Sequence, residues 1–184
     1  MTRLSFNTAL LFAPLAYALH HIEENVILDF RVWRLTYFAD NNALTTEAVL
    51  SILMAITFVY LIIHALLANR ISAAFVLIFL MSSQVHNVLF HLVGSVVFWH
   101  YSPGLATALL LYVPVNVLIA RFALKEGIAT WPQLALYFLI GGATFWAFEV
   151  FGPVVLFGGV LTGWVLTFVL SSWHSKRATQ AASA

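Results

Sequence analysis

Apolar runs of about 20 residues recur along the whole chain, and a charge, a proline or a short polar cluster ends each one. A helix of that length crosses the hydrocarbon core of a bilayer while it satisfies its own backbone hydrogen bonds. With 62% hydrophobic and only 8% charged residues, the chain lacks the polar surface that a water-soluble domain needs. We therefore predict an all-α fold, namely a polytopic membrane helical bundle.

The apolar runs predict about six transmembrane helices in a single domain. We place these helices at residues 4–24, 48–68, 71–99, 104–121, 132–151 and 153–173. Residues 25–46 alternate charged with aromatic side chains, a pattern that predicts a short interfacial helix after the first span. We assign residues 1–174 to one transmembrane domain and residues 175–184 to a short polar, disordered tail.

The basic residues predict how the bundle is oriented. With six spans, the N-terminal side carries most of them, whereas the opposite side carries only Arg31 and Arg34. The N-terminal side holds Arg3, Arg70, Arg121, Lys125, Lys176 and Arg177. Because positively charged loops are retained in the cytoplasm, we expect both termini to be cytoplasmic. The first, third and fifth spans then run outward and end in one outer layer of the membrane.

Ionisable residues gather where the first apolar run ends. His20, His21, Glu23 and Glu24 lie almost side by side in a chain that has few charges. On a helix, His20, Glu23 and Glu24 are spaced i, i+3 and i+4 and share one face, whereas His21 points about 100° away. Charged side chains in lipid are costly, so this group needs partners or a ligand.

The third span carries a second polar group at a similar predicted depth. Gln84, Asn87 and His91 form one stripe at i, i+3 and i+7, and His86 flanks the stripe. The outward-running fifth span brings Glu149 to the same layer. We expect these side chains to face the interior of the bundle, because lipid does not solvate them.

A metal site accounts for both groups. The chain contains no cysteine, so a metal would be bound by imidazole and carboxylate, the donors that suit zinc or iron. The expected metal ligands are His20, Glu23, Glu24, His86 and His91. Either Glu23 or Glu24 would remain free to act as a catalytic general base. The residues expected to lie beside the ligands and orient them are Asn87, Gln84, Glu149 and His21.

Two alternative functions fit the same residues. In the first, the carboxylates pair with histidines as an ion-paired clamp between helices of a structural subunit, or simply reach the interface. In the second, the group carries protons, a metal ion or a cationic ligand in a membrane binding or transport protein. The presence of a tightly bound metal separates the metal site from the clamp.

The sequence resembles one known family in three segments. His20-His21-Ile22-Glu23-Glu24 fits the His-x-x-Glu-Glu pattern of the HXXEE domain family, which are small, hydrophobic bacterial membrane proteins. The later matching residues are His86, Asn87, His91, the segment Tyr101-Ser102-Pro103-Gly104 and Pro114. The resemblance covers most of residues 8–125. It implies an integral protein of the bacterial inner membrane and the location of a site, but no established reaction.

These observations lead us to expect a metal-dependent integral membrane enzyme with its cluster in the outer half of the bundle. Its substrate would be a lipophilic or membrane-accessible small molecule. Hydrolysis by a zinc-activated water and iron-centred oxidation or isomerisation both fit the expected ligands. The expected partners are membrane lipid and this lipophilic molecule; no nucleic-acid-binding motif is present in the sequence.

Overall fold

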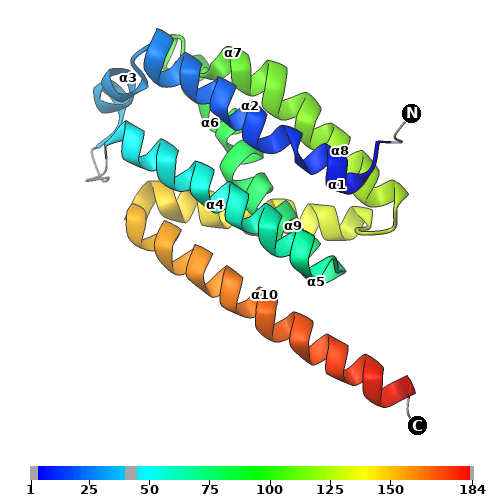
Figure 1. The fold of residues 1–184 in the computed structure, drawn as a ribbon. Coiled ribbons are helices and arrows are strands. Elements are labelled where there is room, and N and C mark those ends of the chain that lie inside the picture. Colours follow the sequence, from blue (N-terminus) through cyan, green and yellow to red (C-terminus); the bar gives the residue numbers. More distant parts are fainter. Residues whose placement is uncertain (1–3, 40–44, 183–184) are drawn as a thin grey trace.

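The computed structural model describes residues 4–39 and 45–182, and their regular structure is helical (Figure 1). Elements that follow one another without a gap form longer rods. When residues 6–10 are counted with residues 12–27 across a turn at Leu11, the described residues form seven helices. This confirms the predicted all-α class. The count is seven rather than about six, and the short helix predicted after the first span is one of the seven.

The elements follow in one order along the chain. They are α1 (Phe6–Leu10), α2 (Phe12–Ile22), η1 (Glu23–Ile27), α3 (Phe30–Tyr37), α4 (Thr46–Leu67), α5 (Arg70–Leu80), η2 (Met81–His86), α6 (Asn87–Phe98), α7 (Leu105–Thr107), η3 (Ala108–Tyr112), α8 (Val113–Lys125), α9 (Trp131–Phe151) and α10 (Pro153–Ala182). The three elements named η are single π-helical turns; η2 and η3 lie within α-helical rods, and η1 ends one. The rod made of α5, η2 and α6 lies centrally, because α4, α8, α9 and α10 all pack against it (Figure 1).

Five helices among the described residues are long and apolar enough to cross a membrane. They are Glu47–Leu67, Arg70–Phe98, Leu105–Lys125, Trp131–Phe151 and Pro153–His174, and they match the second to sixth predicted spans within a few residues. The predicted first span is also helical, but a turn at Leu11 divides it into α1 and α2. Neither piece alone reaches the length of a membrane span.

Local sequence determines where the helices begin and end. Thr45 caps α4 by accepting a hydrogen bond from the Ala48 backbone N–H, and Asn69 with Ser72 forms a capping box at the start of α5. Gly152 adopts a φ of +70° between α9 and α10, a conformation that glycine reaches without strain. These short connections make neighbouring spans antiparallel.

The short helix α3 lies within the segment predicted to be interfacial. Asp29 caps it by accepting a hydrogen bond from the Val32 backbone N–H over 3.0 Å. Trp33 of α3 is buried and packs edge-on against Phe90 of α6, with 6.2 Å between the ring centroids. Residues 40–44, the remaining part of that segment before α4, lie outside the described residues.

The last helix is longer than the sequence pattern predicts. α10 continues through Ala182, so it includes most of the tail expected to be disordered after residue 174. The tail contains alanine, lysine, arginine and glutamine, which favour helix, and it has no glycine or proline to end one. Residues 183 and 184 lie outside the described part of the chain.

Apolar side chains cover the surface of the bundle, and its interior holds polar as well as apolar side chains. Gln84, His91 and Thr167 are fully buried, whereas Val26 and Leu66 are more than three-quarters exposed. A water-soluble protein exposes fewer large apolar side chains, and lipid favours such a surface. Together with the five apolar helices, this distribution identifies the chain as an integral membrane protein.

Candidate metal centre

Three buried side chains from two helical rods meet at one point. His20 at the end of α2 and Glu24 in η1 belong to the first rod, which consists of α1, α2 and η1. His91 in α6 belongs to the central rod, which consists of α5, η2 and α6. The Oε1 atom of Glu24 lies 3.2 Å from His20 Nε2 and 3.0 Å from His91 Nε2. One donor atom of each residue lies within 4.8 Å of the other two donors.

The spacing and the burial of these donors fit a transition-metal ion. Zinc binds imidazole nitrogen and carboxylate oxygen at about 2.0–2.2 Å, so neighbouring ligands of one ion lie about 3–3.5 Å apart. The Nε2 atoms of His20 and His91 are close to Glu24, yet neither has the geometry of a hydrogen bond. Buried polar atoms without a hydrogen bond are rare and costly, and a cation bound between them would remove that cost.

Hydrogen bonding at Thr107 determines which nitrogen of His20 is free. The Thr107 hydroxyl donates its proton to the Glu23 carboxylate, so its oxygen is left to accept from His20 Nδ1 at 3.0 Å. The proton of neutral His20 is therefore on Nδ1, and the lone pair of Nε2 faces Glu24. A lone pair facing a carboxylate is the arrangement of two metal ligands, and outer hydrogen bonds of this kind orient ligating histidines.

Ser102 has the corresponding role at His91. Its hydroxyl oxygen lies 2.8 Å from His91 Nδ1, and its backbone N–H donates to Ser95 Oγ at 2.8 Å. This second bond holds the loop that follows α6 against the end of that helix. Both histidines thus use Nδ1 for a hydroxyl partner and present Nε2 to Glu24.

Gly104, in the same loop, lies directly against the three donors. Its φ is +97°, which favours glycine. A Cβ atom here would lie 2.7 Å from both Glu24 Cγ and His20 Cε1, and 3.0 Å from His91 Cε1. The close approach of the backbone therefore requires glycine, and the loop closes one side of the site.

Glu23, expected as a metal ligand or general base, lies outside the group of donors. Successive residues of a helix point about 100° apart, so Glu24 faces α6 while Glu23 faces the loop. Glu23 accepts hydrogen bonds from the Tyr101 hydroxyl, from the Thr107 hydroxyl and, over 2.7 Å, from the Thr107 backbone N–H. Partial burial and then the bond to Glu23 raise the pKa of Tyr101, which keeps its hydroxyl a donor. Glu23 thus anchors Thr107, which orients His20.

His86, also expected as a metal ligand, points away from the site. It lies five residues before His91 on the same rod, and in a regular helix this separation turns the side chains about 140° apart. The His86 ring packs on Phe138 of α9 at 4.3 Å, and its Nδ1 atom donates to the Met81 carbonyl over 2.9 Å. His86 therefore connects the central rod to α9.

Two of the four residues expected to orient the ligands have partners of their own. Gln84 donates to the Ala13 carbonyl at 2.9 Å and accepts from Asn116 at 2.8 Å, so it joins three rods below the site. Glu149 forms an ion pair of 2.7 Å with Arg34 of α3. The hydrogen bonds between described side chains include none from Gln84 or Glu149 to a donor of the candidate centre.

His21 and Asn87, the other two residues expected to orient the ligands, lie nearer to the candidate centre. The Nδ1 atom of His21 is 2.9 Å from Glu24 Oε2, the carboxylate oxygen that faces away from His20 and His91. Asn87 lines a cavity that reaches the site, and its Oδ1 atom is buried without a hydrogen-bond partner.

Sequence reasoning missed the roles of Ser102, Gly104 and Thr107. A signal for the first two was present, since both belong to the Tyr-Ser-Pro-Gly segment that carries the family resemblance. Thr107 follows three residues later and has no distinguishing pattern in one sequence. Its role depends on the loop folding back onto the first rod.

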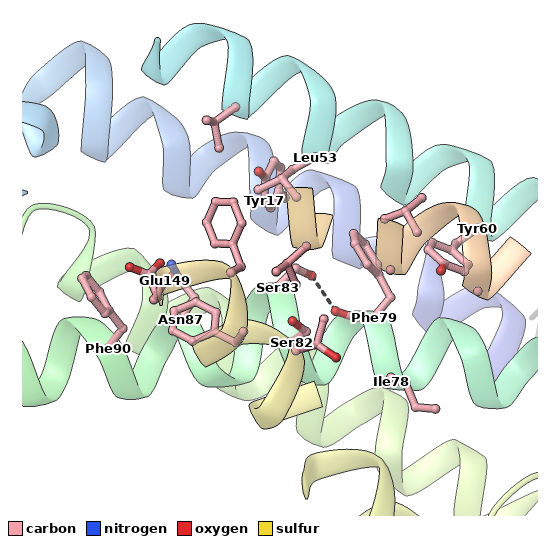
Figure 2. Close-up of a pocket in the computed structure, with 18 of the residues that line it drawn as sticks. Tyr17, Leu53, Tyr60, Ile78, Phe79, Ser82, Ser83, Asn87, Phe90 and Glu149 are labelled. Carbon is pink, nitrogen blue, oxygen red and sulfur yellow. Dashed lines mark hydrogen bonds between the residues drawn. The ribbon is translucent and has the colours of Figure 1, made fainter. Parts of the chain in front are cut away.

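A cavity of about 490 Å³ extends from the centre into the bundle, and its walls are mostly apolar. His20, His21 and Glu24 contribute to its lining, and the rest comes from α2, α3, α4, the central rod, η3, α9 and α10. Figure 2 shows Phe90 and Glu149 at one end of this lining and Tyr60 at the other. The volume is in the range of cavities that bind small molecules.

The fold and the site define a polytopic helical membrane protein with a buried His/Glu group that could hold a metal ion. The family described as "Protein of unknown function with HXXEE motif" matches residues 11–119, and the chain belongs to this family. The matched region includes His20, Glu24 and His91 together with Thr107, so the whole candidate centre lies within it.

The chain is similar to one curated protein of a named bacterium. "Uncharacterized protein YrkK" of Bacillus subtilis (strain 168) is 37% identical over 71 residues, which make up 38% of this chain and 45% of the relative. The match therefore spans less than half the length of either protein. No solved structure matches the chain significantly.

Proposed function

We propose that the protein is a metal-dependent integral membrane enzyme that acts on a lipophilic small molecule. The convergence of His20 Nε2, His91 Nε2 and Glu24 Oε1 carries the proposal, because the two buried imidazole nitrogens lack other hydrogen bonds. The outer partners on Nδ1 of both histidines support the same conclusion.

Three protein ligands leave coordination positions for water or substrate. Two histidines and a carboxylate hold catalytic zinc in hydrolases and iron(II) in oxygenases. Zinc would supply an activated water for hydrolysis, and iron would support oxidation or isomerisation. The identity of the bound metal therefore decides the class of reaction.

The cavity supports a lipophilic substrate. Its lining includes many aromatic and aliphatic side chains, such as Leu53, Phe79 and Phe145. A polar metabolite would lose hydration along these apolar walls, whereas an apolar chain would not. The donors His20 and Glu24 form part of the same lining, so a molecule in the cavity can reach the metal position.

We place the centre in the outer half of a bacterial inner membrane, with both termini in the cytoplasm. The distribution of basic residues between the two sides supports this orientation. The site lies where α2 ends and α7 begins, at the end of the bundle where α6 ends rather than the end where α9 begins (Figure 1).

A structural clamp is the second candidate. Glu24 lies within 3.2 Å of a nitrogen of His20, His21 and His91, and protonated histidines would pair with it across two rods. In that case the group would stabilise the bundle and hold no metal. The two functions therefore differ in one measurable quantity, the metal content of the purified protein.

Elemental mass spectrometry of protein purified in detergent without chelators tests the proposal. We expect about one equivalent of zinc or iron per chain, and its loss in Glu24→Ala and His91→Ala. Glu47→Ala, which changes an exposed glutamate at the start of α4, should retain the metal. Roughly a tenth of an equivalent or less in the unmodified protein would rule out the metalloenzyme and favour the clamp.

A further inference from the structure

The cavity reaches the outer surface of the bundle along α10. Gly158 and Gly159 of α10 line the cavity, and both residues are exposed. A Cβ atom on either glycine would meet no neighbouring atom within 4 Å, so this part of the helix borders open space. Leu166, two turns further along α10, also lines the cavity and is 42% exposed. The cavity is therefore open to the medium that surrounds the bundle.

Close packing of α4 against α10 ends where this opening begins. A Cβ atom on Gly163 of α10 would lie 2.5 Å from the Tyr60 hydroxyl of α4, so the two helices touch there. Gly158 and Gly159 lie about one turn nearer to the start of α10, and Leu53 lines the cavity two turns before Tyr60 on α4. Both helices begin at the end of the bundle that holds the candidate metal centre (Figure 1). The opening and the centre therefore lie in the same half of the bundle.

Charged side chains occupy only one end of the described lining. They are Glu24, Arg31, Arg34 and Glu149, which belong to η1, α3 and the last turn of α9. The lining residues that α4, the central rod and α10 contribute are uncharged. A polar group in the cavity therefore favours the end beside the centre, and an apolar chain favours the remainder.

The uncharged part of the cavity is as long as a lipid chain. On the central rod its lining runs from Phe90 to Phe75, which corresponds to about 22 Å of helix. One leaflet of a bilayer contributes about 15 Å of hydrocarbon, half of a core of about 30 Å. A hydrocarbon chain of membrane-lipid length can therefore lie along the central rod.

We propose that the cavity binds a single long hydrocarbon chain, which enters sideways from the lipid between α4 and α10. Gly158 and Gly159 form the entrance, and the chain lies along the central rod with its polar end toward Glu24. A molecule of the membrane reaches such an entrance without exposing its chain to water, which is unfavourable. The binding of the chain requires no metal, whereas its role as the substrate rests on the metalloenzyme function proposed above.

Photochemical labelling in vesicles of palmitoyl-oleoyl phosphatidylcholine tests the proposal. The probe is hexadecane with a diazirine at one end, because it carries no head group that could decide where it binds. We expect mass spectrometry to find the label on Phe79 and Ser83, which line the cavity on the central rod. Label on Val169, an exposed residue of α10 outside the lining, measures how much probe has entered the bilayer.

Two variants close the entrance from opposite sides. The double variant Gly158→Leu/Gly159→Leu adds bulk on α10, and Leu53→Trp adds bulk on α4. Relative to the label on the surface of α10, the label inside the cavity should fall about tenfold in each variant. Ala55→Leu adds bulk to an exposed residue of α4 outside the lining, and this matched control should change neither label.

Thermal melting separates a closed entrance from a damaged fold. The double leucine variant should melt no lower than the unmodified protein, since leucine favours a helix more than glycine does and its Cβ atom meets no neighbour. The absence of label inside the unmodified cavity would overturn the proposal. So would a cavity label that neither variant reduces.

Metal content, measured on the same samples, keeps this inference separate from the proposed function. The double leucine variant should keep its metal, because the donors His20, Glu24 and His91 lie on other helices. A metal-free protein whose cavity label depends on the two glycines would refute the enzyme alone. A metal-loaded protein whose cavity is never labelled would refute this inference alone.

Discussion

Glu24 Oε1 lies 3.0 Å from His91 Nε2, and this contact joins the first helical rod to the central one. Both side chains are almost completely buried, at 4% and 0% exposure. The short contact identifies His91, rather than His86, as the histidine of the central rod that belongs to the centre. On the first rod, likewise, Glu24 contacts the two histidines, whereas the adjacent Glu23 does not.

Replacing His91 and replacing His86 should have different effects on metal binding and on stability. His91→Ala should abolish metal binding, whereas His86→Ala should keep the metal and lower the free energy of unfolding by about 1–3 kcal/mol. The second effect follows from the lost bond to the Met81 carbonyl and the lost packing on Phe138. Metal analysis and thermal melting of both variants in detergent check this, and metal loss in His86→Ala would contradict it.

Gly104→Ala should damage the centre directly. The added Cβ atom would approach Glu24 Cγ and His20 Cε1 to 2.7 Å, so we expect metal affinity to fall about 10–100-fold. Gly127→Ala is the matched control, since Gly127 also has a positive φ, of +67°, but lies far from the donors. Chelator competition measures the affinities; an equal loss in both variants would show that backbone strain, and not the site, is responsible.

Thr107→Val should weaken metal binding by about 10–100-fold, because His20 Nδ1 loses its acceptor and Glu23 loses a donor. Thr107→Ser keeps the hydroxyl and should bind metal normally. Thr167→Val removes a buried hydroxyl that donates to the Gly163 carbonyl of its own helix, and it should leave the affinity unchanged. The same chelator titration compares the three, and full binding by Thr107→Val would disprove the orienting role.

The Arg34–Glu149 ion pair should stabilise the contact between α3 and α9. Its atoms are 2.7 Å apart and its side chains are 18% and 12% exposed, so we expect a coupling free energy of about 1–2 kcal/mol. A double-mutant cycle of Arg34→Gln and Glu149→Gln, read by thermal unfolding, measures this value. Additive effects of the two substitutions would mean that the pair contributes nothing, and metal content should stay constant throughout the cycle.

The predicted orientation can be tested with two matched tryptophans. Trp99 and Trp131 are 93% and 73% exposed at opposite ends of the bundle, and the chain has no cysteine. In intact cells, a membrane-impermeant thiol reagent should label Trp99→Cys and spare Trp131→Cys until the cells are opened. The reverse pattern would place both termini outside the cytoplasm.

Much of the fold follows from local sequence. Predicted spans two to six agree with the observed helices within a few residues, because apolar run length and the glycines and prolines between runs are local properties. The apolar pattern predicts the first span as one helix, and the turn at Leu11 has no comparable signal. The same pattern underestimates the length of α10 beyond residue 174, although its residues favour helix.

Composition and run length by themselves determined that the chain is a helical membrane bundle, and the His20 to Glu24 motif located its polar site. Only the tertiary structure decided which donors meet, because convergence depends on how two rods are rotated and shifted against each other. That packing selects Glu24 and His91 over Glu23 and His86. It also brings Thr107, Ser102 and Tyr112 to the site from distant segments, which one sequence cannot reveal.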